Sequence, residues 1–404
     1  MYSYGIDWGE AQLSLCILND QGRRLCELDF APTPAGFGMI EAERIKLGAA
    51  PSDCVVAIET STHLVVDYLL EHDYPVHLIS PQATDGYRNR QGSNKAHTDR
   101  RDAALLAGIL RTDRDSHPRW RPNAPLTQHL AAQLRLVETL RRSIHRQTCQ
   151  LRAALMRTFP AALEVFSELT TQLALQLLVA YPTAAEASAL TQDEFAAFCR
   201  THGDTRPTFI PTRYATLTRP VPSVAPAVAA AYRDTVATLA EVLLPQVRRR
   251  QQFIRQLEAL LAQHPDAPIF ASLPQAGPIL AAGLLVKLGD ERVRFPTAGA
   301  VQALAGTCPV TRWSGKKRVV VFRRGCDREF RHIAHQFARA SLTTSSWAKA
   351  YWREVRPRCA SHAHADRLLA NRWLAIIWKL WQTRQPYDEA YHLKQRAQRV
   401  CPKS

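Results

Sequence analysis

The sequence predicts an α/β domain at the N-terminus, a helical coiled-coil middle and a mainly α-helical C-terminal part. Three observations predict this architecture. Short apolar runs alternate with helical stretches over residues 1–112. Leucine and valine then recur at spacings of three, four or seven along two long segments. A glycine-rich turn and a tryptophan-rich helix mark the remainder of the 404 residues, a length with room for roughly two or three domains.

The N-terminal elements follow in order along the chain. "YGIDWG" is strand-like, and "AQLSLCILND" with "QGRRLCELDF" predicts a hairpin that turns at Asn19–Gly22. "CVVAIET" (54–60) is a short apolar run typical of a buried strand, "THLVVDYLLEHDY" predicts a helix, and "PVHLIS" another strand. After a basic, flexible connection, "YRNRQGSNKAH", the segment "TDRRDAALLAGILR" predicts a helix. The sheet should be mostly parallel, and the hairpin makes it mixed.

The middle of the chain is helical. Apolar residues at helical or near-heptad spacing cover residues 125–160 and about 227–263, which predicts long antiparallel helices or a coiled coil. Between them we expect a helical insert over about 160–203. The proline-rich segment "TRPTFIPTRYATLTRPVPSVAP" that follows it predicts an ordered but irregular connection.

Two segments stand out in the C-terminal part. "FASLPQAGPILAAGLLVKLGD" resembles a helix-hairpin-helix, whose turn amides can hold a nucleic-acid phosphate. A plain helix-turn-helix packing unit explains the same pattern equally well. "RLLANRWLAIIWKLW" predicts a helix that packs in the core or at a protomer interface.

Composition narrows the class of partner. A net charge of +16, with 22% charged residues, favours polyanions: nucleic acid first, an anionic membrane surface second. Solubilising basicity is the ordinary alternative. No apolar run approaches the length of a membrane span, so no membrane partner is expected. Nine cysteines without a Cys-x-x-Cys pair argue against a disulfide framework or zinc ribbon and for a cytoplasmic protein.

Four carboxylates stand out by position. Asp7 lies in the first strand, Glu59 ends the central apolar strand, and Asp99 and Asp102 share one face of a helix. Each alone has an ordinary explanation as a strand end or a helix N-terminal acid. Together, in a basic protein, they predict the metal site of a ribonuclease-H-like fold, because Mg²⁺ prefers a few carboxylates plus phosphate oxygens.

Ser314 and Gly315 lie in a strongly basic segment. A serine hydroxyl there could attack a phosphodiester and form a phosphoserine that conserves the bond energy for rejoining. No obvious base adjoins Ser314, and the local sequence alone favours a β-turn before the strand "KRVVVF". The basic side chains predicted to contact nucleic acid are Arg312, Lys316, Lys317, Arg318, Arg323, Arg324, Arg328 and Arg331.

The motifs carry a family resemblance from end to end. They are "GIDWGEAQLSLCILNDQG", "VVAIETSTHLVVDYL", "SNKAHTDRRDAALLAGIL", "LPQAGPILAAGLLVKLGD", "FPTAGAVQALAGTCPVTRWSGKK" and "GCDREFRHIAHQFARAS". In this order the chain is similar to the DEDD-type insertion-sequence transposases, the insertion sequence one-hundred-ten family. It departs from the family's pattern at Thr60–His63 and at "GTCP", which affects local loops and none of the four acids or the serine.

The resemblance implies a domain plan and a set of roles. A RuvC-like domain (1–115) would hold Mg²⁺ or Mn²⁺ on Asp7, Glu59, Asp99 and Asp102, with Lys95 on nucleic acid. A helical and coiled-coil region with the proline-rich insert (116–265) would precede a transposase domain (266–404) that carries the nucleophile Ser314.

The resemblance also implies partners. They are double-stranded donor and target DNA, a structured bridge RNA that pairs with both, and a homo-oligomer (dimer or tetramer) that shares active sites between protomers. The protein would be bacterial and cytoplasmic, and nucleoid-associated when acting.

Three functions remain open at this stage. The first is an RNA-guided recombinase that cuts and rejoins DNA through Ser314. The second is an Mg²⁺-dependent, structure-selective endonuclease that uses the four acids alone. A third, an RNA-binding or chromosome-organising protein, leaves the four acids unexplained.

Overall fold

The computed structural model describes residues 1–90, 98–203, 207–220, 224–315 and 317–400. The chain divides into two compact units, Met1–Pro122 and Asn123–Ser404. Two residues predicted to bind nucleic acid, Lys95 and Lys316, lie outside the described residues. Within the described ranges, no helix combines the length and apolarity that crossing a membrane requires.

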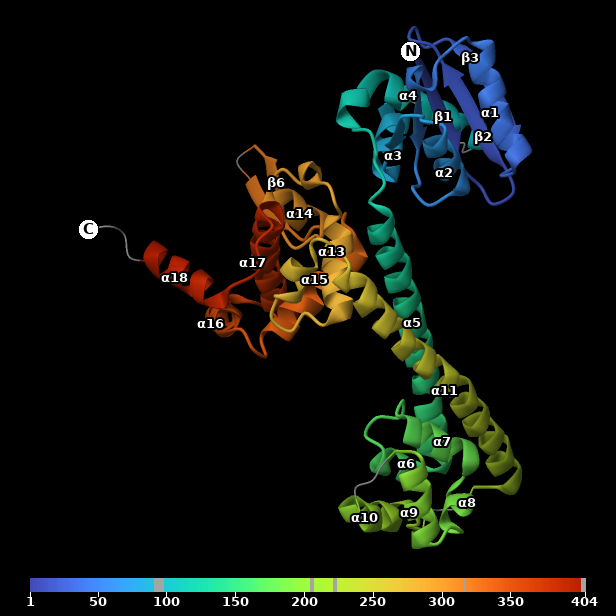
Figure 1. Ribbon diagram of the computed structural model, residues 1–404, viewed down its shortest axis with the longest axis vertical. Coiled ribbons are helices and arrows are strands. Elements are labelled where there is room, and N and C mark those ends of the chain that lie inside the picture. Colours follow the sequence, from blue (N-terminus) through green and yellow to red (C-terminus); the bar gives the residue numbers. More distant parts are fainter. Residues whose placement is uncertain (91–97, 204–206, 221–223, 316, 401–404) are drawn as a thin grey trace. The chain divides into compact units, whose positions relative to one another are not determined.

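The N-terminal unit is a five-stranded mixed sheet with helices on both faces (Figure 1). The sheet order is β3-β2-β1-β4-β5, with β1–β4 and β4–β5 parallel and the two pairs formed by β2 antiparallel. This confirms that the sheet is mixed, but the expectation of a mostly parallel sheet is wrong, because two of the four strand pairs are antiparallel. The elements are β1 (Tyr2–Asp7), β2 (Leu13–Leu18), β3 (Arg24–Phe30), α1 (Pro34–Lys46), β4 (Cys54–Ile58), α2 (Leu64–Glu71), β5 (Val76–Leu78), α3 (Pro81–Arg90) and α4 (Asp99–Asp113).

The two faces of the sheet alternate along each strand. In β4, Val56 and Ile58 face a core shared with α1 and α2, whereas Val55 and Ala57 face α4. This period of two produces the continuous apolar run seen in the sequence, because both faces are covered by helices. The predicted turn at Asn19–Gly22 is confirmed: the Gly22 amide donates to the Asn19 carbonyl over 2.9 Å, and Gly22 has φ +84°.

Helix α4 crosses β1 at a glycine. A Cβ placed on Gly5 would lie 1.9 Å from the Ala103 carbonyl oxygen and 2.4 Å from the Ala107 nitrogen. Only a residue without a side chain fits there, and the small alanines on α4 complete the close approach. This contact sets the position of the whole α4 helix on the sheet.

The second unit is helical apart from one hairpin. Its helices in Figure 1 are α5 (Pro125–Thr158), α6 (Pro160–Val165), α7 (Gln172–Ala180), α8 (Ala184–Ser188), α9 (Gln192–Thr201), α10 (Ile210–Leu217), α11 (Pro226–Ala262), α12 (Ala267–Ala271), α13 (Pro278–Leu288), α14 (Ala298–Leu304), α15 (Arg328–Ser341), α16 (Ser346–Val355), α17 (His362–Thr383) and α18 (Glu389–Val400), and its strands are β6 (Val310–Ser314) and β7 (Lys317–Val321).

Helices α5 and α11 form the predicted antiparallel pair. Gln133 donates to Gln256 over 3.0 Å and Gln246 donates to Gln147 over 3.1 Å, so residue numbers rise along one helix as they fall along the other. Helices α6–α10 pack against the far half of the pair in a separate core. The expected irregular connection is wrong over Ile210–Leu217, which forms α10 because Ile210 and Leu217 are buried in that core.

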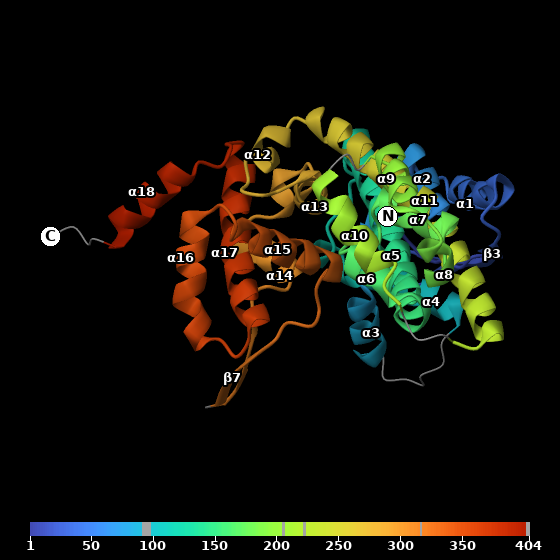
Figure 2. The same cartoon turned by 90° about the horizontal axis from the view of Figure 1, so that it is seen from below.

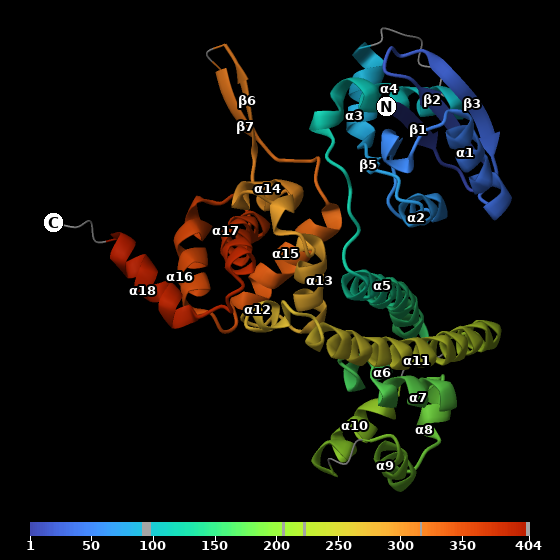
Figure 3. The same cartoon turned by 45° about the horizontal axis from the view of Figure 1, so that its top comes forward.

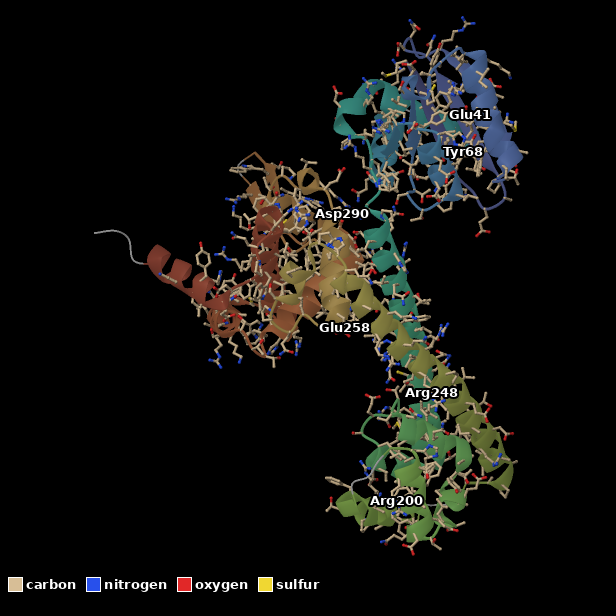
Figure 4. All side chains as sticks on the ribbon, viewed as in Figure 1. Glu41, Tyr68, Arg200, Arg248, Glu258 and Asp290 are labelled. Atoms are coloured by element: carbon tan, nitrogen blue, oxygen red, sulfur yellow. The ribbon has the colours of Figure 1, made fainter. Side chains whose placement is uncertain are left out.

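Asp290 ties the start of α5 to the end of α13. It accepts hydrogen bonds from the Ala124 amide and from Thr127 Oγ1, each at 2.7 Å, and lies 3.2 Å from His264 Nε2 (Figure 4). The residue that caps α5, Ala124, has no side-chain oxygen, so Asp290 supplies the missing acceptor at this helix N-terminus.

The C-terminal helices share one apolar core. Trp373 and Trp381 of α17 are fully buried, so of the two predicted positions for this helix the structure shows the core. Figure 2 shows α17 beside α15 and α16. Helices α12 and α13 form the helix-turn-helix expected from the glycine-rich segment, with α13 capped by Gly277. The hairpin of β6 and β7 stands out from these helices, as Figure 3 shows.

We predict that Gly5→Ala displaces α4, because the added methyl group meets backbone atoms that cannot move separately. The loss in unfolding free energy should be about 2 kcal/mol or more, and amide hydrogen exchange in α4 should accelerate. Gly38→Ala is the control, because nothing lies within 4 Å of its added carbon. It should stabilise helix α1 by ~0.5–1 kcal/mol. Equal unfolding of both variants in urea would contradict the prediction.

Candidate active site

Two of the four predicted acids come from adjacent parallel strands. Asp7 is the last residue of β1, and Glu59 directly follows β4. The register pairs Ile6 with Ile58. The next residue of each strand therefore leaves the sheet at the same edge, and Asp7 and Glu59 are neighbours there.

The other two acids sit at the N-terminus of α4. Thr98 caps the helix by accepting from the Arg101 amide over 3.4 Å, which makes Asp99 the first helical residue and Asp102 the fourth. Arg100 donates to Asp29 of β3 over 2.7 and 2.9 Å. This ion pair lowers the pKa of Asp29 and fastens the start of α4 to the sheet edge.

The four carboxylates act on one another electrostatically. Burial, and after it the negative charges of Asp102, Asp99 and Glu59, together raise the pKa of Asp7 to about 6. Like charges within reach of a partly buried carboxyl group oppose its ionisation. In the structure the four predicted acids are thus close enough for the charges of three of them to raise the pKa of the fourth, Asp7.

Helix α3 adds two side chains that the sequence analysis missed. Thr84 Oγ1 donates to Glu59 over 2.5 Å, and Arg88 Nη2 donates to Asp102 over 2.8 Å. The sequence analysis had assigned the region from Tyr87 onward to a flexible connection, which is wrong up to Arg90. A signal was present: Pro81 follows Ser80 at the first helical position, a common helix start.

The four carboxylates are hard oxygen donors, as Mg²⁺ requires. Across the described residues, however, no group of three or more Asp, Glu, His or Cys side chains converges closely enough to hold a metal ion. Glu59 and Asp102 are turned to Thr84 and Arg88 instead. The uncompensated charge that raises the pKa of Asp7 nevertheless fits a cation among these groups.

Ser314 lies at the tip of the β6–β7 hairpin. It ends β6 and pairs with Lys317, and the turn residue Gly315 has φ +55°. Ser314 is exposed, and its hydroxyl forms no hydrogen bond with the described residues. The expected turn before a strand is therefore present, and no neighbouring base accompanies it.

The hairpin sorts its side chains onto two faces. Arg312 and Lys317 share a face with Ser314, because residues directly opposite, or two apart along a strand, point the same way. Trp313 and Arg318 lie on the other face, where the guanidinium stacks 5.7 Å from the ring centroid. Two exposed cations thus flank the serine on its own face.

The remaining predicted basic residues lie beyond the hairpin. Arg323 and Arg324 follow β7, and Arg328 and Arg331 are in the first turn of α15. Arg324 and Arg328 are exposed, whereas Arg323 and Arg331 are partly buried. The acids belong to the unit Met1–Pro122 and the serine region to the unit Asn123–Ser404.

Known protein families match segments in both units of the chain. A family model described as Transposase matches residues 4–160, and a model described as Transposase IS116/IS110/IS902 family matches residues 267–353. The mini-circle putative transposase for IS117 of Streptomyces coelicolor is 32% identical over 95% of each chain. A putative transposase, y4uE, of Sinorhizobium fredii is 30% identical over 49% of this chain and 56% of its own. The IS900 42 kDa protein of Mycobacterium paratuberculosis is 25% identical over 96% of this chain and 97% of its own.

These matches define the protein as a transposase, an enzyme that acts on DNA. The chain belongs to the IS110 family of insertion-sequence transposases, as the sequence motifs predicted.

We predict that Asp7 makes the metal-free protein less stable as pH rises from about 4 to about 6. The unfolded chain releases this proton near pH 4, whereas the folded protein holds it to about pH 6. Folding therefore binds a proton within this window, and stability falls with rising pH.

Asp7→Asn should remove this decline and raise the melting temperature above pH 6, measured by thermal unfolding in EDTA. Asp20→Asn is the control, because the Asp20 side chain is 68% exposed. If the melting temperatures of the wild type and Asp7→Asn changed with pH in the same way, the charge of Asp7 would not destabilise the folded protein.

Proposed function

We propose that this transposase cuts and rejoins DNA through a phosphoserine at Ser314, with a divalent metal, Mg²⁺ or Mn²⁺, at Asp7, Glu59, Asp99 and Asp102. The observation that carries this proposal is the effect of three acidic neighbours on Asp7. A folded protein keeps such repulsion when a ligand compensates it in the working state. A cation is the ligand that four clustered carboxylates require.

The fold supports a RuvC-like assignment for the first unit. A mixed sheet with two acids at the ends of adjacent parallel strands and two more on a covering helix matches that arrangement. On this view residues 1–115 form the metal-binding domain, 116–265 the coiled-coil region and 266–404 the transposase domain. The turn between α12 and α13 would act as a helix-hairpin-helix that holds a phosphate through its amides.

The chemistry exchanges one ester for another. Ser314 Oγ attacks a phosphorus of the DNA backbone and forms a phosphoserine bond, while the bond from phosphorus to the leaving sugar oxygen breaks and that oxygen takes up a proton. A sugar hydroxyl of the other DNA then attacks the phosphoserine, loses its proton and restores Ser314. Arg312 and Lys317 on the serine's face stabilise the charge that develops on the phosphate oxygens.

The serine needs an activator that its surroundings lack. No hydrogen bond joins its hydroxyl to a described neighbour, and a bound metal ion would supply the activation and neutralise the leaving oxygen. We infer that the acids of one protomer serve the serine of another within a dimer or tetramer. A structured bridge RNA, paired with donor and target DNA, would select the sites.

A metal-dependent, structure-selective endonuclease is the alternative. It is favoured by the hairpin geometry, in which Ser314 and Gly315 form an ordinary tight turn. In that function the four acids activate water, and the cut DNA carries free ends.

We predict that Ser314→Ala abolishes the covalent protein–DNA adduct and recombination, because an alanine has no oxygen to attack phosphorus. Adducts are measured by denaturing electrophoresis of labelled DNA. Asp99→Ala should also abolish cleavage, whereas Arg318→Ala, on the opposite face of the hairpin, should leave adduct formation within a few-fold. Normal recombination by Ser314→Ala would exclude the serine as nucleophile. Cleavage to free ends by Ser314→Ala, with Asp99→Ala inactive, would establish the endonuclease instead.

We also predict that the purified protein carries a discrete RNA transcribed from DNA that flanks its gene. A protein with a net charge of +16 also binds RNA nonspecifically, so the copurifying RNA should be sequenced after washing at high salt. A charge-matched nucleic-acid-binding protein treated identically is the control. Only heterogeneous cellular RNA, equal in both samples, would exclude guidance by a dedicated RNA.

A further inference from the structure

A stack of two arginines on one aromatic ring lies at the base of the β6–β7 hairpin. Phe322 follows β7, and its ring lies 4.5 Å from the Arg331 guanidinium and 4.9 Å from that of Arg367. Arg331 comes from α15 and Arg367 from α17. Three elements thus contribute to one cluster, and two like charges share one ring.

The cations of this cluster lack neutralising partners. No ion pair joins Arg323, Arg331 or Arg367 to an acid among the described residues. The carboxylates around it are engaged: Asp366 accepts from Arg339 over 3.2 Å and from Trp352 over 2.8 Å, and Asp327 accepts from Lys287 over 2.9 Å. Burial and the charge of Arg331 both lower the pKa of the Arg367 guanidinium.

Three buried nitrogens point to a missing acceptor. Arg323 Nε, Arg331 Nε and His335 Nε2 are buried and have no hydrogen-bond partner in the described structure. Leaving such groups unpaired costs on the order of 1–3 kcal/mol each. Arg331 does donate through Nη2 to the Arg323 carbonyl, which fixes its position. Gly306 makes room for this arrangement, because a Cβ there would lie 2.4 Å from Arg331 Nη2.

We propose that Arg331, Arg367 and His335 form a binding site for one backbone phosphate of DNA, with Phe322 holding the two guanidiniums in place. A phosphate supplies both the negative charge and the acceptor oxygens that the cluster lacks. Two planar guanidiniums stacked on a ring are already ordered, so little side-chain entropy is lost on binding. This inference rests on the proposed function in one respect: it assumes that the nucleic acid bound at this hairpin is DNA.

The site holds a different phosphate from the one that Ser314 would attack. Phe322 lies five residues beyond Lys317, the residue paired with Ser314. At about 3.3 Å per residue the cluster is ~16 Å from the hairpin tip along β7. That distance spans roughly five base-pair steps of duplex. The cluster would therefore position the DNA strand while the hairpin tip acts on it.

The test uses the full-length protein and a fluorescein-labelled duplex, with affinity measured by anisotropy across salt concentrations. Each phosphate contact contributes about 0.9 to the slope of log K against log salt. Arg367→Met keeps an unbranched side chain but removes the charge, and it should reduce the slope by about 0.9. Arg331→Met should do the same. The double variant should lose no more than either single one, because both arginines hold the same phosphate.

Arg372→Met is the matched control, because Arg372 lies on the same helix and stacks on one ring, that of Tyr351. It should leave the slope unchanged. Thermal unfolding without DNA provides a second measurement. Because Arg331 and Arg367 repel each other, Arg367→Met should melt at or above the wild-type temperature, whereas a purely structural arginine would lower it.

Any of three binding results would overturn the proposal, besides the phosphate result given next: an unchanged slope for Arg367→Met on duplex DNA, a slope change confined to a single-stranded RNA probe, or a loss of about two contacts in the double variant. Protection of the wild type by millimolar inorganic phosphate, without any effect of Arg367→Met on DNA, would identify a free-phosphate site instead and also reject it. Ser314→Ala should bind the duplex with the wild-type slope, so failure of the serine mechanism would remain distinguishable from failure of this site.

Discussion

The contact between Gly5 and helix α4 determines the acidic site. A β-strand and a helix normally keep the distance that their side chains impose, but the bare Gly5 backbone meets the Ala103 carbonyl directly. Because α4 is held this close, its first turn reaches the edge of the sheet where β1 ends. The charges of Asp102 and Asp99 then add to the effect of burial in raising the pKa of Asp7. A packing constraint inside the unit thus has an electrostatic consequence at its surface.

Other side chains of the same unit reduce the repulsion among the four carboxylates. Arg88 binds Asp102, Thr84 donates to Glu59, and Arg100 holds the start of α4 through Asp29. Arg88 offsets part of the negative charge without adding a metal ligand, so it occupies the place of a counter-ion.

Much of the fold was predictable, because its signals are local. The continuous apolar run in 54–58 and the apolar spacing along α5 and α11 reflect burial and period alone, and these elements were confirmed. Helix α3 was missed because its apolar content is low and only Thr84 is buried. Helix α10 was missed because its segment is rich in proline, with Pro211 inside the helix itself, and its buried residues Ile210 and Leu217 pack on the insert core. Tertiary contacts, rather than local preference, form both elements.

The residues of the candidate site also fall into two groups: those that the sequence alone predicts and those that only the fold brings together. Positions such as Asp7 and Glu59 follow from strand ends, which a sequence reveals. The fold alone brings Thr84 and Arg88 to the acids. It likewise brings Arg367 to Phe322 and His335 to Arg367. Sequence analysis finds basic residues by density along the chain, and it therefore weighted Arg312–Arg331 and passed over Arg367.

The two charge clusters obey one rule with opposite signs. Around Asp7, burial and three neighbouring carboxylates oppose the ionisation of Asp7; around Phe322, burial and the charge of Arg331 lower the pKa of Arg367. If stability of the folded protein were the only requirement, each charge at both places would be paired with an opposite one, since a paired charge costs less free energy to bury than an unpaired one. Each cluster instead keeps an excess of one charge, negative for the acids and positive for the arginines, and the ligand proposed for each has the opposite charge. Binding of the proposed ligand would supply the missing opposite charge at each cluster, and it would therefore stabilise the folded protein.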